Sequence, residues 1–131
     1  MELRRYLTDR GDVVRALECF ARHLAPGGII LVEPWITPEN WRHDGPSMLT
    51  VDQPDLKICR MNVNRVEGNL TIIAFDYLIG TRALVEHVQE EHVLALYTIE
   101  EMLEFFRRAN LKVRHDAQGL DGRGLYVTAP Q

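Results

Sequence analysis

The chain has 131 residues, of which 46% are hydrophobic and 26% charged, as in an ordinary single globular domain. Fifteen basic and nineteen acidic residues give a net charge of -4, which excludes the strongly basic surface of a typical nucleic-acid-binding protein. No apolar run approaches the roughly 18 residues of a membrane span, and the start is polar, so we expect a cytoplasmic protein with neither nucleic acid nor membrane as a partner.

The first predicted element is a helix over residues 9–24, which Asp9 or Asp12 could cap. Its apolar stripe consists of Val13, Val14, Leu17, Phe20, Ala21 and Leu24. Pro26 and the two glycines after it end the helix. Residues 29–32 follow as a short apolar run, a pattern typical of a strand buried on both faces in a parallel sheet.

The middle of the chain predicts a loop followed by a meander of strands. Residues 36–55 are rich in proline and polar residues, so we expect a long loop there. From Leu56 to Tyr97, alternating runs separated by turns near Gly68 and Gly80 predict three antiparallel strands. In the first run, one face carries Cys59, Met61 and Val63, and the other carries Arg60, Asn62 and Asn64. The third run, residues 84–97, also fits a helix, but the two strands before it favour a strand.

The end of the chain predicts a second helix and a strand pair. Thr98 and Glu101 have the spacing of a capping box, and the helix should stop near Asn110. Two short strands, residues 112–115 and 125–127, follow. We therefore predict one domain over residues 1–131, made of a helix and buried strand (1–35), a loop (36–55), an antiparallel meander (56–97), and a helix with a terminal strand pair (98–131).

Several motifs together carry a resemblance to a known family: Leu24–Gly28, Ile29–Trp35, Leu96–Glu101, Ala109–Val113 and Gly122–Leu125. On these motifs the chain resembles the class I S-adenosylmethionine-dependent methyltransferases, and most closely the N-methyltransferases of deoxyaminosugar biosynthesis. The resemblance implies an α/β fold, namely the C-terminal half of a Rossmann-like methyltransferase fold with a three-stranded antiparallel insertion. It also implies S-adenosylmethionine as the cofactor, and a small-molecule amine, such as a nucleotide-linked aminosugar, as the substrate.

The sequence departs from that family at the cofactor site. The family binds its cofactor with a glycine-rich turn after the first strand, because glycine lets the backbone approach the ligand closely. Here Gly27 and Gly28 follow a helix, and the glycines of residues 119–124 precede no helix. We therefore assign no cofactor-binding residue and expect a truncated chain, equivalent to the family's C-terminal half, whose activity on its own stays open at this point. Residues 1–7 then correspond to the end of the region after the family's fourth strand.

Three residues are candidates for substrate binding, each with a simpler alternative. Trp35, at the end of the predicted buried strand, would line the pocket of an amine substrate or pack under the following loop. Arg123, between two glycines, would bind the diphosphate of a nucleotide sugar or be an exposed turn residue. Tyr6 falls where the family places a residue near the cofactor and the amine, and it is otherwise a frayed terminal residue. No residue is assigned a catalytic role.

His87 and His92 invite a metal site, but they are five residues apart. This spacing separates them on a helix and puts them on opposite faces of a strand, so we predict no metal site. Glu86, Glu90 and Glu91 instead indicate a charged outer strand that resists edge-to-edge pairing.

Two functions from different classes remain open. The first is the substrate side of an S-adenosylmethionine-dependent N-methyltransferase. The second is a non-enzymatic α+β module that dimerises or binds a ligand. Under either function, residues 29–32 and the helix stripe would be incompletely covered in a monomer, so we expect a homo-oligomer or a swapped dimer.

Overall fold

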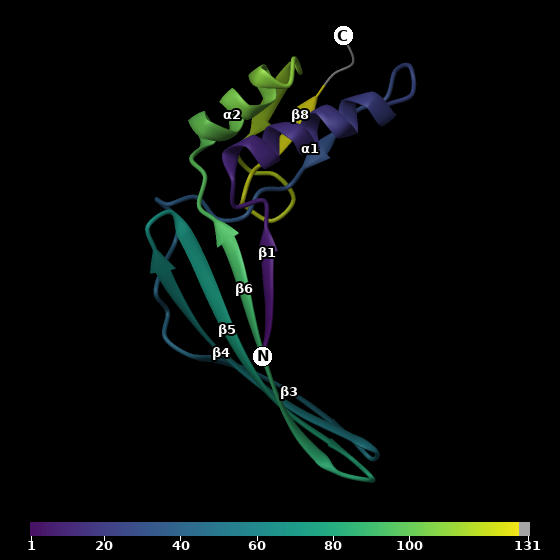
Figure 1. The fold of residues 1–131 in the computed structure, drawn as a ribbon, viewed down its shortest axis with the longest axis vertical. Coiled ribbons are helices and arrows are strands. Elements are labelled where there is room, and N and C mark those ends of the chain that lie inside the picture. The colour runs from purple at the N-terminus through teal and green to yellow at the C-terminus, as the bar shows by residue number, and fades with distance from the viewer. Residues whose placement is uncertain (129–131) are drawn as a thin grey trace. The chain divides into compact units, whose positions relative to one another are not determined.

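The structure is a computed structural model that describes residues 1–128. Its elements (Figure 1) are β1 (Glu2–Tyr6), α1 (Arg10–His23), β2 (Leu31–Val32), β3 (Ser47–Gln53), β4 (Leu56–Glu67), β5 (Leu70–Thr81), β6 (Val85–Ala95), α2 (Ile99–Arg108), β7 (Val113–Asp116) and β8 (Leu125–Thr128). The predicted terminal segment extends to residue 131, and its last three residues lie outside the described range. Neither described helix is long and apolar enough to cross a membrane.

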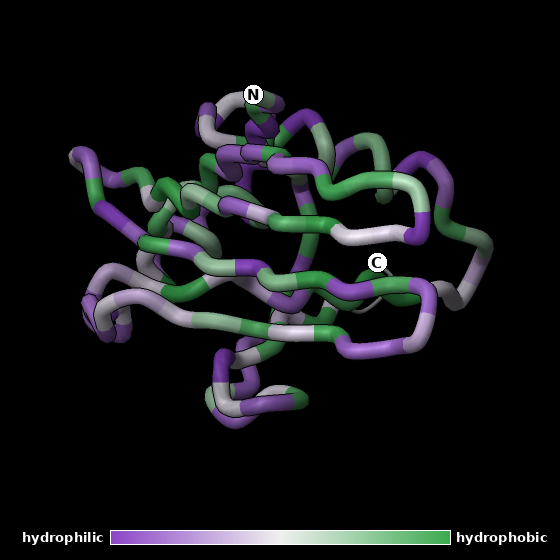
Figure 2. The backbone as a smooth tube through the Cα atoms, turned by 90° about the horizontal axis from the view of Figure 1, so that it is seen from below, coloured by the Kyte–Doolittle hydropathy of each residue, from purple (hydrophilic) through white to green (hydrophobic). Residues whose placement is uncertain are grey.

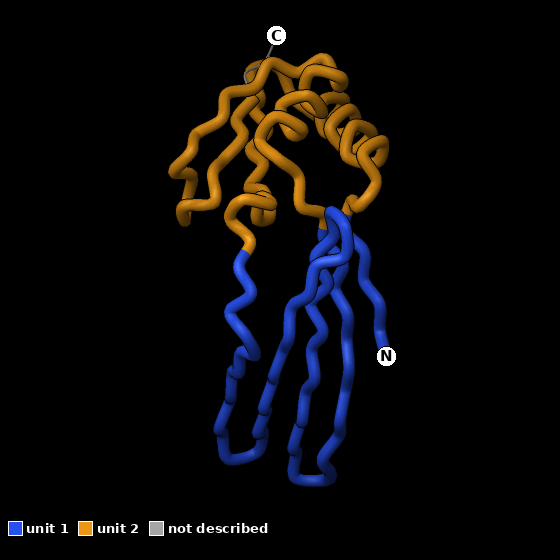
Figure 3. The backbone as a smooth tube through the Cα atoms, turned by 90° about the vertical axis from the view of Figure 1, so that its left-hand side faces the viewer, with its two compact units in different colours: residues 1–6, 42–94 blue, residues 7–41, 95–131 orange. Residues whose placement is uncertain are grey.

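The chain forms two compact units (Figure 3). The first, which we call the sheet unit, consists of Met1–Tyr6 and Arg42–Leu94. The second, the helix unit, consists of Leu7–Trp41 and Ala95–Gln131. The elements confirm the predicted α/β class, with a mixed five-stranded sheet in one unit and a three-stranded antiparallel sheet in the other.

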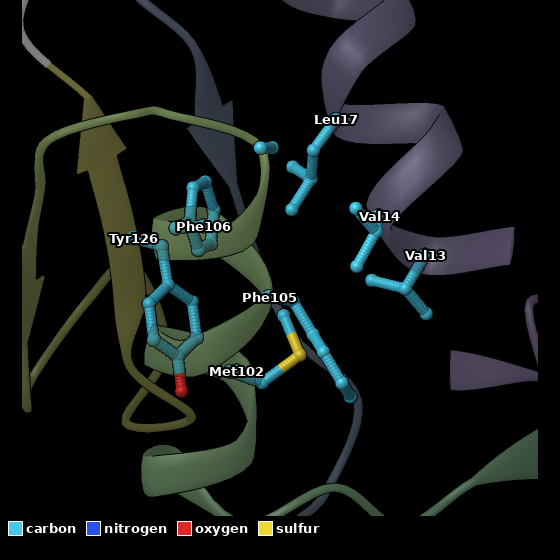
Figure 4. Close-up of a cluster of buried hydrophobic side chains, with 8 residues drawn as sticks. Val13, Val14, Leu17, Met102, Phe105, Phe106 and Tyr126 are labelled. Atoms are coloured by element: carbon cyan, nitrogen blue, oxygen red, sulfur yellow. The ribbon is translucent and has the colours of Figure 1, made fainter. Parts of the chain in front are cut away.

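The core of the helix unit gathers side chains from α1, α2 and β8, with α2 contacting both α1 and Tyr126 of β8 (Figure 4). Phe106 is fully buried, and its ring stacks on Tyr126 with the centroids 5.5 Å apart. The other members of the core are Val13, Val14, Leu17, Met102, Phe105 and Ala109. They recur at helical spacing, which is why the sequence predicted both helices.

Local capping fixes where the two helices begin. The Asp9 side chain accepts a hydrogen bond from the Asp12 amide at 3.1 Å, so Asp9 is the N-cap of α1. At α2 the predicted capping box is present: Thr98 accepts from the Glu101 amide, and the Glu101 carboxylate accepts from the Thr98 amide. Each bond satisfies an amide that has no partner within the helix.

The sheet unit is built on five strands in the order β1-β6-β5-β4-β3. Strands β3, β4 and β5 pair antiparallel, and β6 runs back beside β5 after a turn in which the Thr81 amide donates to the Leu84 carbonyl. The predicted meander is therefore confirmed, and residues 85–95 form a strand rather than a helix. Both hydrophobic and hydrophilic segments lie along the strands of the tube view (Figure 2).

Two sequence predictions about strands are wrong, and one strand was not predicted. Residues 47–53 form β3 instead of loop, because Pro46 and Pro54 mark the ends of a strand and do not exclude one between them. The strand that was not predicted is β1, residues 2–6, which pairs parallel with residues 90–94 of β6. Over those residues β6 lies between β1 and β5 and is not an outer strand.

The strand after α1 is also different from the prediction of a strand buried on both faces. β2 pairs antiparallel with β8, and among residues 1–128 it is an edge strand. Ile30 is buried, but Ile29 and Leu31 are 54% and 58% exposed. The apolar run therefore has one covered face and one open face, which agrees with the expected incomplete cover.

Candidate functional site

One face of the sheet unit joins a tyrosine, a histidine and a glutamate by hydrogen bonds. The Tyr6 hydroxyl lies 2.9 Å from Nδ1 of His92, and Nε2 of His92 lies 3.1 Å from Oε2 of Glu90. Tyr6 ends β1, and the other two residues lie two apart on β6, so the parallel pairing of these strands brings the three together (Figure 1). We call this set the Tyr–His–Glu chain.

Aromatic packing holds the imidazole of this chain in place. The Tyr6 and His92 rings stack with their centroids 5.6 Å apart, and Phe75 of β5 meets His92 edge-on at 5.2 Å. The side chains of His92 and Glu90 are 20% and 21% exposed, whereas Tyr6 is 44% exposed. The tyrosine is thus the member of the chain that a ligand in solution meets first.

The electrostatics favour an ionised glutamate at the inner end of the chain. The hydrogen bond from His92 is the main cause that holds the pKa of Glu90 below its ordinary value, against the opposing effect of burial. The charge of Arg4 and a hydrogen bond from Tyr77 add to this lowering. An anionic Glu90 in turn orients His92, because a neutral imidazole that donates from Nε2 can accept at Nδ1 from Tyr6.

This arrangement can accept a proton or orient a polar hydrogen. A histidine held by a carboxylate is a familiar general base, and the tyrosine hydroxyl extends its reach toward solvent. The geometry is therefore suited to a ligand with a polar, protonated group such as an amine, placed beside Tyr6.

The helix unit contains the other two predicted residues. Arg123 forms ion pairs with Glu33 and with Asp121, the latter at 2.8 Å. Trp35 lies after β2 and is partly buried, ahead of the turn in which the amides of Asn40 and Trp41 donate to the Thr37 carbonyl. A ligand anion at Arg123 would have to compete with two carboxylates.

The glycines of the described chain do not form a nucleotide-type cradle. Gly27 and Gly28 lie between α1 and β2, so no strand leads into this turn. A Cβ at Gly119 would lie 2.5 Å from the backbone of Gly124, so that turn is filled by its own main chain. Within residues 1–128 there is thus no strand–glycine turn–helix element that fits S-adenosylmethionine.

Comparison with known proteins identifies the relatives of this chain. It is 33% identical over 126 residues to the dTDP-3-amino-3,6-dideoxy-alpha-D-glucopyranose N,N-dimethyltransferase of Streptomyces fradiae, and the match covers 95% of this chain and 49% of that protein. DesVI from Streptomyces venezuelae matches with a TM-score of 0.86 at 31% identity, over 96% of this chain and 54% of that chain. This chain is homologous to the C-terminal half of the dTDP-aminosugar N,N-dimethyltransferases.

A further solved relative is an amino pentose methyltransferase from Micromonospora echinaspora, CalS10, whose structure contains S-adenosylmethionine. It matches with a TM-score of 0.80 at 26% identity, over 95% of this chain and 53% of that chain. The chain thus spans about half the length of the aminosugar methyltransferases that it matches. No protein-family model matches it. The predicted resemblance and the predicted half-fold are both confirmed.

The three residues predicted from the aminosugar methyltransferase resemblance lie in different units. Tyr6 is in the sheet unit, where it is fixed by His92 rather than frayed. Trp35 and Arg123 are in the helix unit, and their contact with a substrate stays a proposal.

Sequence reasoning missed His92 and Glu90 as partners of Tyr6. The only local signal was the alternation that places these two residues on one face of a strand. Their partner comes from β1, which the sequence did not predict. His87 lies on the other face of β6 and bonds instead to Asp76 at 2.7 Å, as the five-residue spacing indicated.

Proposed function

We propose that this chain supplies the acceptor-binding side of an S-adenosylmethionine-dependent N-methyltransferase that acts on the amino group of a nucleotide-linked sugar. Two observations support the proposal. The chain is homologous over 95% of its length to aminosugar N,N-dimethyltransferases. Its sheet unit also carries the Tyr–His–Glu chain, which suits a protonated nitrogen.

The chemistry of N-methylation sets what an acceptor site must do. The nitrogen must present an unprotonated lone pair, and it must be held in line with the methyl group that it receives. S-adenosylmethionine supplies that methyl group as an electrophile. Because no glycine cradle for it occurs among residues 1–128, we assign these residues no step that involves the cofactor.

The described residues would bind and prepare the amine. The Tyr6 hydroxyl would contact the nitrogen, because it is the exposed end of the chain. A proton leaving the nitrogen would reach the tyrosine oxygen as the tyrosine proton passes to Nδ1 of His92. The resulting imidazolium would be stabilised by Glu90, to which it already donates.

A non-enzymatic ligand-binding or dimerisation module is the second candidate, and the exposed Ile29 and Leu31 on an edge strand favour it. The two candidates differ in what they bind. A module that only self-associates gains no stability from an aminosugar, whereas a native acceptor site must.

The experiment is thermal unfolding with three ligands in turn: a dTDP-linked aminosugar, the same sugar with a hydroxyl replacing the amine, and S-adenosylmethionine. We expect the aminosugar to raise the Tm most and S-adenosylmethionine to have no effect. Mass spectrometry of a mixture with both substrates then tests for methyl transfer by this chain alone. Equal Tm values with all three ligands at millimolar concentration would exclude the proposed acceptor site.

A further inference from the structure

Arg60 stands apart from the other basic residues of the chain. All fifteen arginines and lysines lie in the described range, and Arg60 is the only one whose residue is not exposed. Most of the others are paired with carboxylates, as Arg65 is with Glu67 and Glu91. Arg60 forms no ion pair with any described residue, so its charge is partly buried and uncompensated.

The Arg60 guanidinium is held in place by an aromatic ring. Its Cζ lies 5.0 Å from the centroid of the Phe75 ring, which is a cation–π contact. Its Nε is buried, and no described group accepts a hydrogen bond from it. A buried donor without an acceptor is costly, so native structures rarely keep one unless a ligand or water completes it.

The same face of the sheet surrounds Arg60 with polar groups. Arg60 is paired across the sheet with Tyr77, and Asn62 is paired with Phe75. Asn62 is buried, accepts from the Ser47 hydroxyl at 2.6 Å and donates to Asn64 at 3.0 Å. The amide of Asn62 is thus already engaged, whereas the buried Nε of Arg60 donates to no described group.

Arg60 and the Tyr–His–Glu chain share this face through Phe75. That ring contacts Arg60 on one side and the edge of His92 on the other. Arg60 lies on β4 and His92 on β6, with β5 between them. Two strand spacings amount to about 10 Å, which is of the order of one sugar ring and its first phosphate.

From these contacts we infer that Arg60 binds an anionic group of the substrate, the diphosphate that links a sugar to its nucleoside. The inference rests on the proposed function for the identity of the anion. A guanidinium suits this role because its planar donors match two phosphate oxygens at once. Arg123, which the sequence suggested for this role, is already paired with two carboxylates, whereas Arg60 has none.

The experiment measures binding of inorganic diphosphate and of thymidine 5′-diphosphate by isothermal titration calorimetry. The proteins are the full chain, Arg60→Gln, Arg60→Lys and the control Arg65→Gln. Arg65 is the matched control because it lies on the same strand, β4, and pairs with Glu91 on the opposite face. Circular dichroism and urea unfolding establish that each variant is folded.

We expect Arg60→Gln to weaken the binding of both ligands at least tenfold and Arg65→Gln to change it less than twofold. Arg60→Lys should be intermediate, because an ammonium keeps the charge but loses the planar fork. Unchanged affinity in Arg60→Gln, equal losses in Arg60→Gln and Arg65→Gln, or no binding by the unsubstituted chain would each overturn the inference.

The outcomes separate this inference from the proposed function. Diphosphate binding that depends on Arg60, without any preference for an aminosugar, would support the anion site and contradict the methyltransferase proposal. A preference for the aminosugar that Arg60→Gln leaves intact, together with unchanged diphosphate affinity, would support the methyltransferase proposal and contradict the anion site at Arg60.

Discussion

The Tyr6 hydroxyl lies 2.9 Å from Nδ1 of His92, although 86 residues separate them in the chain. The contact exists because β1 pairs parallel with β6 in a register that sets Arg4 opposite His92 and Tyr6 opposite Leu94. The short N-terminal strand therefore completes a hydrogen-bonded chain whose other two members belong to a single strand, β6.

The link between Tyr6 and His92 should be measurable as a coupling energy. We expect Tyr6→Phe and His92→Ala each to lower the free energy of unfolding modestly. The double variant should lose less than the sum, with a coupling of about 0.5–1 kcal/mol for a partly exposed hydrogen bond. Urea unfolding of the four proteins gives this value, and strict additivity would show that the hydrogen bond contributes nothing in solution.

The capping box of α2 predicts a specific dependence of stability on acid. Burial alone would raise the pKa of Glu101, but the hydrogen bonds from the Thr98 amide and from Arg10 outweigh it, so this pKa is lowered. The carboxylate thus stabilises the fold above its unfolded pKa of about 4.3, and this contribution is lost as the pH falls through the lower folded pKa.

Glu101→Gln should therefore be less stable than the unsubstituted chain at pH 7 and should fall less steeply on acidification. The two curves of unfolding free energy should converge in acid, where Glu101 is itself protonated. The matched control is Glu100→Gln, an exposed position in the same first turn of α2. Parallel curves for Glu101→Gln and the unsubstituted chain would contradict this account.

Tyr126 predicts a loss of stability at alkaline pH. Its residue is 1% exposed, and burial raises the pKa of its hydroxyl to about 12. The unfolded chain releases this proton near pH 10, so the folded state is progressively disfavoured as the pH rises from about 10 to about 12. Tyr126→Phe should remove about 2 kcal/mol of this loss. Measuring the free energy of unfolding of both proteins between pH 8 and pH 12 tests this prediction. A difference between the two proteins that stays constant with pH would refute the raised pKa of Tyr126.

The open face of β2 predicts self-association. Leu31 is 58% exposed on an edge strand, and such edges recruit further strands. We expect light scattering at micromolar concentration to give a mass above the 15.1 kDa of one chain. Leu31→Lys should lower that mass, whereas Leu120→Lys, at an exposed turn position, should not. A single chain's mass for the unsubstituted protein would contradict the expectation.

The elements that local chemistry fixes were predictable from the sequence. Thr98 and Glu101 cap α2 through contacts within four residues, and the stripe of α1 identifies its buried face. The turn at Gly68 and the alternation on either side of it similarly identified the meander.

The parts that the sequence did not predict depend on pairing between distant segments. Residues 2–6 have no apolar alternation that marks a strand, and they become one by pairing with β6. Arg60 was recognised only as a member of a polar face, because its unpaired Nε and its contact with Phe75 arise from the packing of β4 against β5. The candidate site was therefore less predictable from the sequence than the two helices and the meander were.

The most direct test is a calorimetric comparison of a dTDP-linked aminosugar with its hydroxyl counterpart, using the full chain and Tyr6→Phe. The account predicts that the chain binds the aminosugar at least fivefold more tightly, and that Tyr6→Phe removes most of this preference while diphosphate affinity is kept. Equal affinity of the unsubstituted chain for the two sugars, or no binding of either at millimolar concentration, would contradict the claim that this sheet face binds the amine.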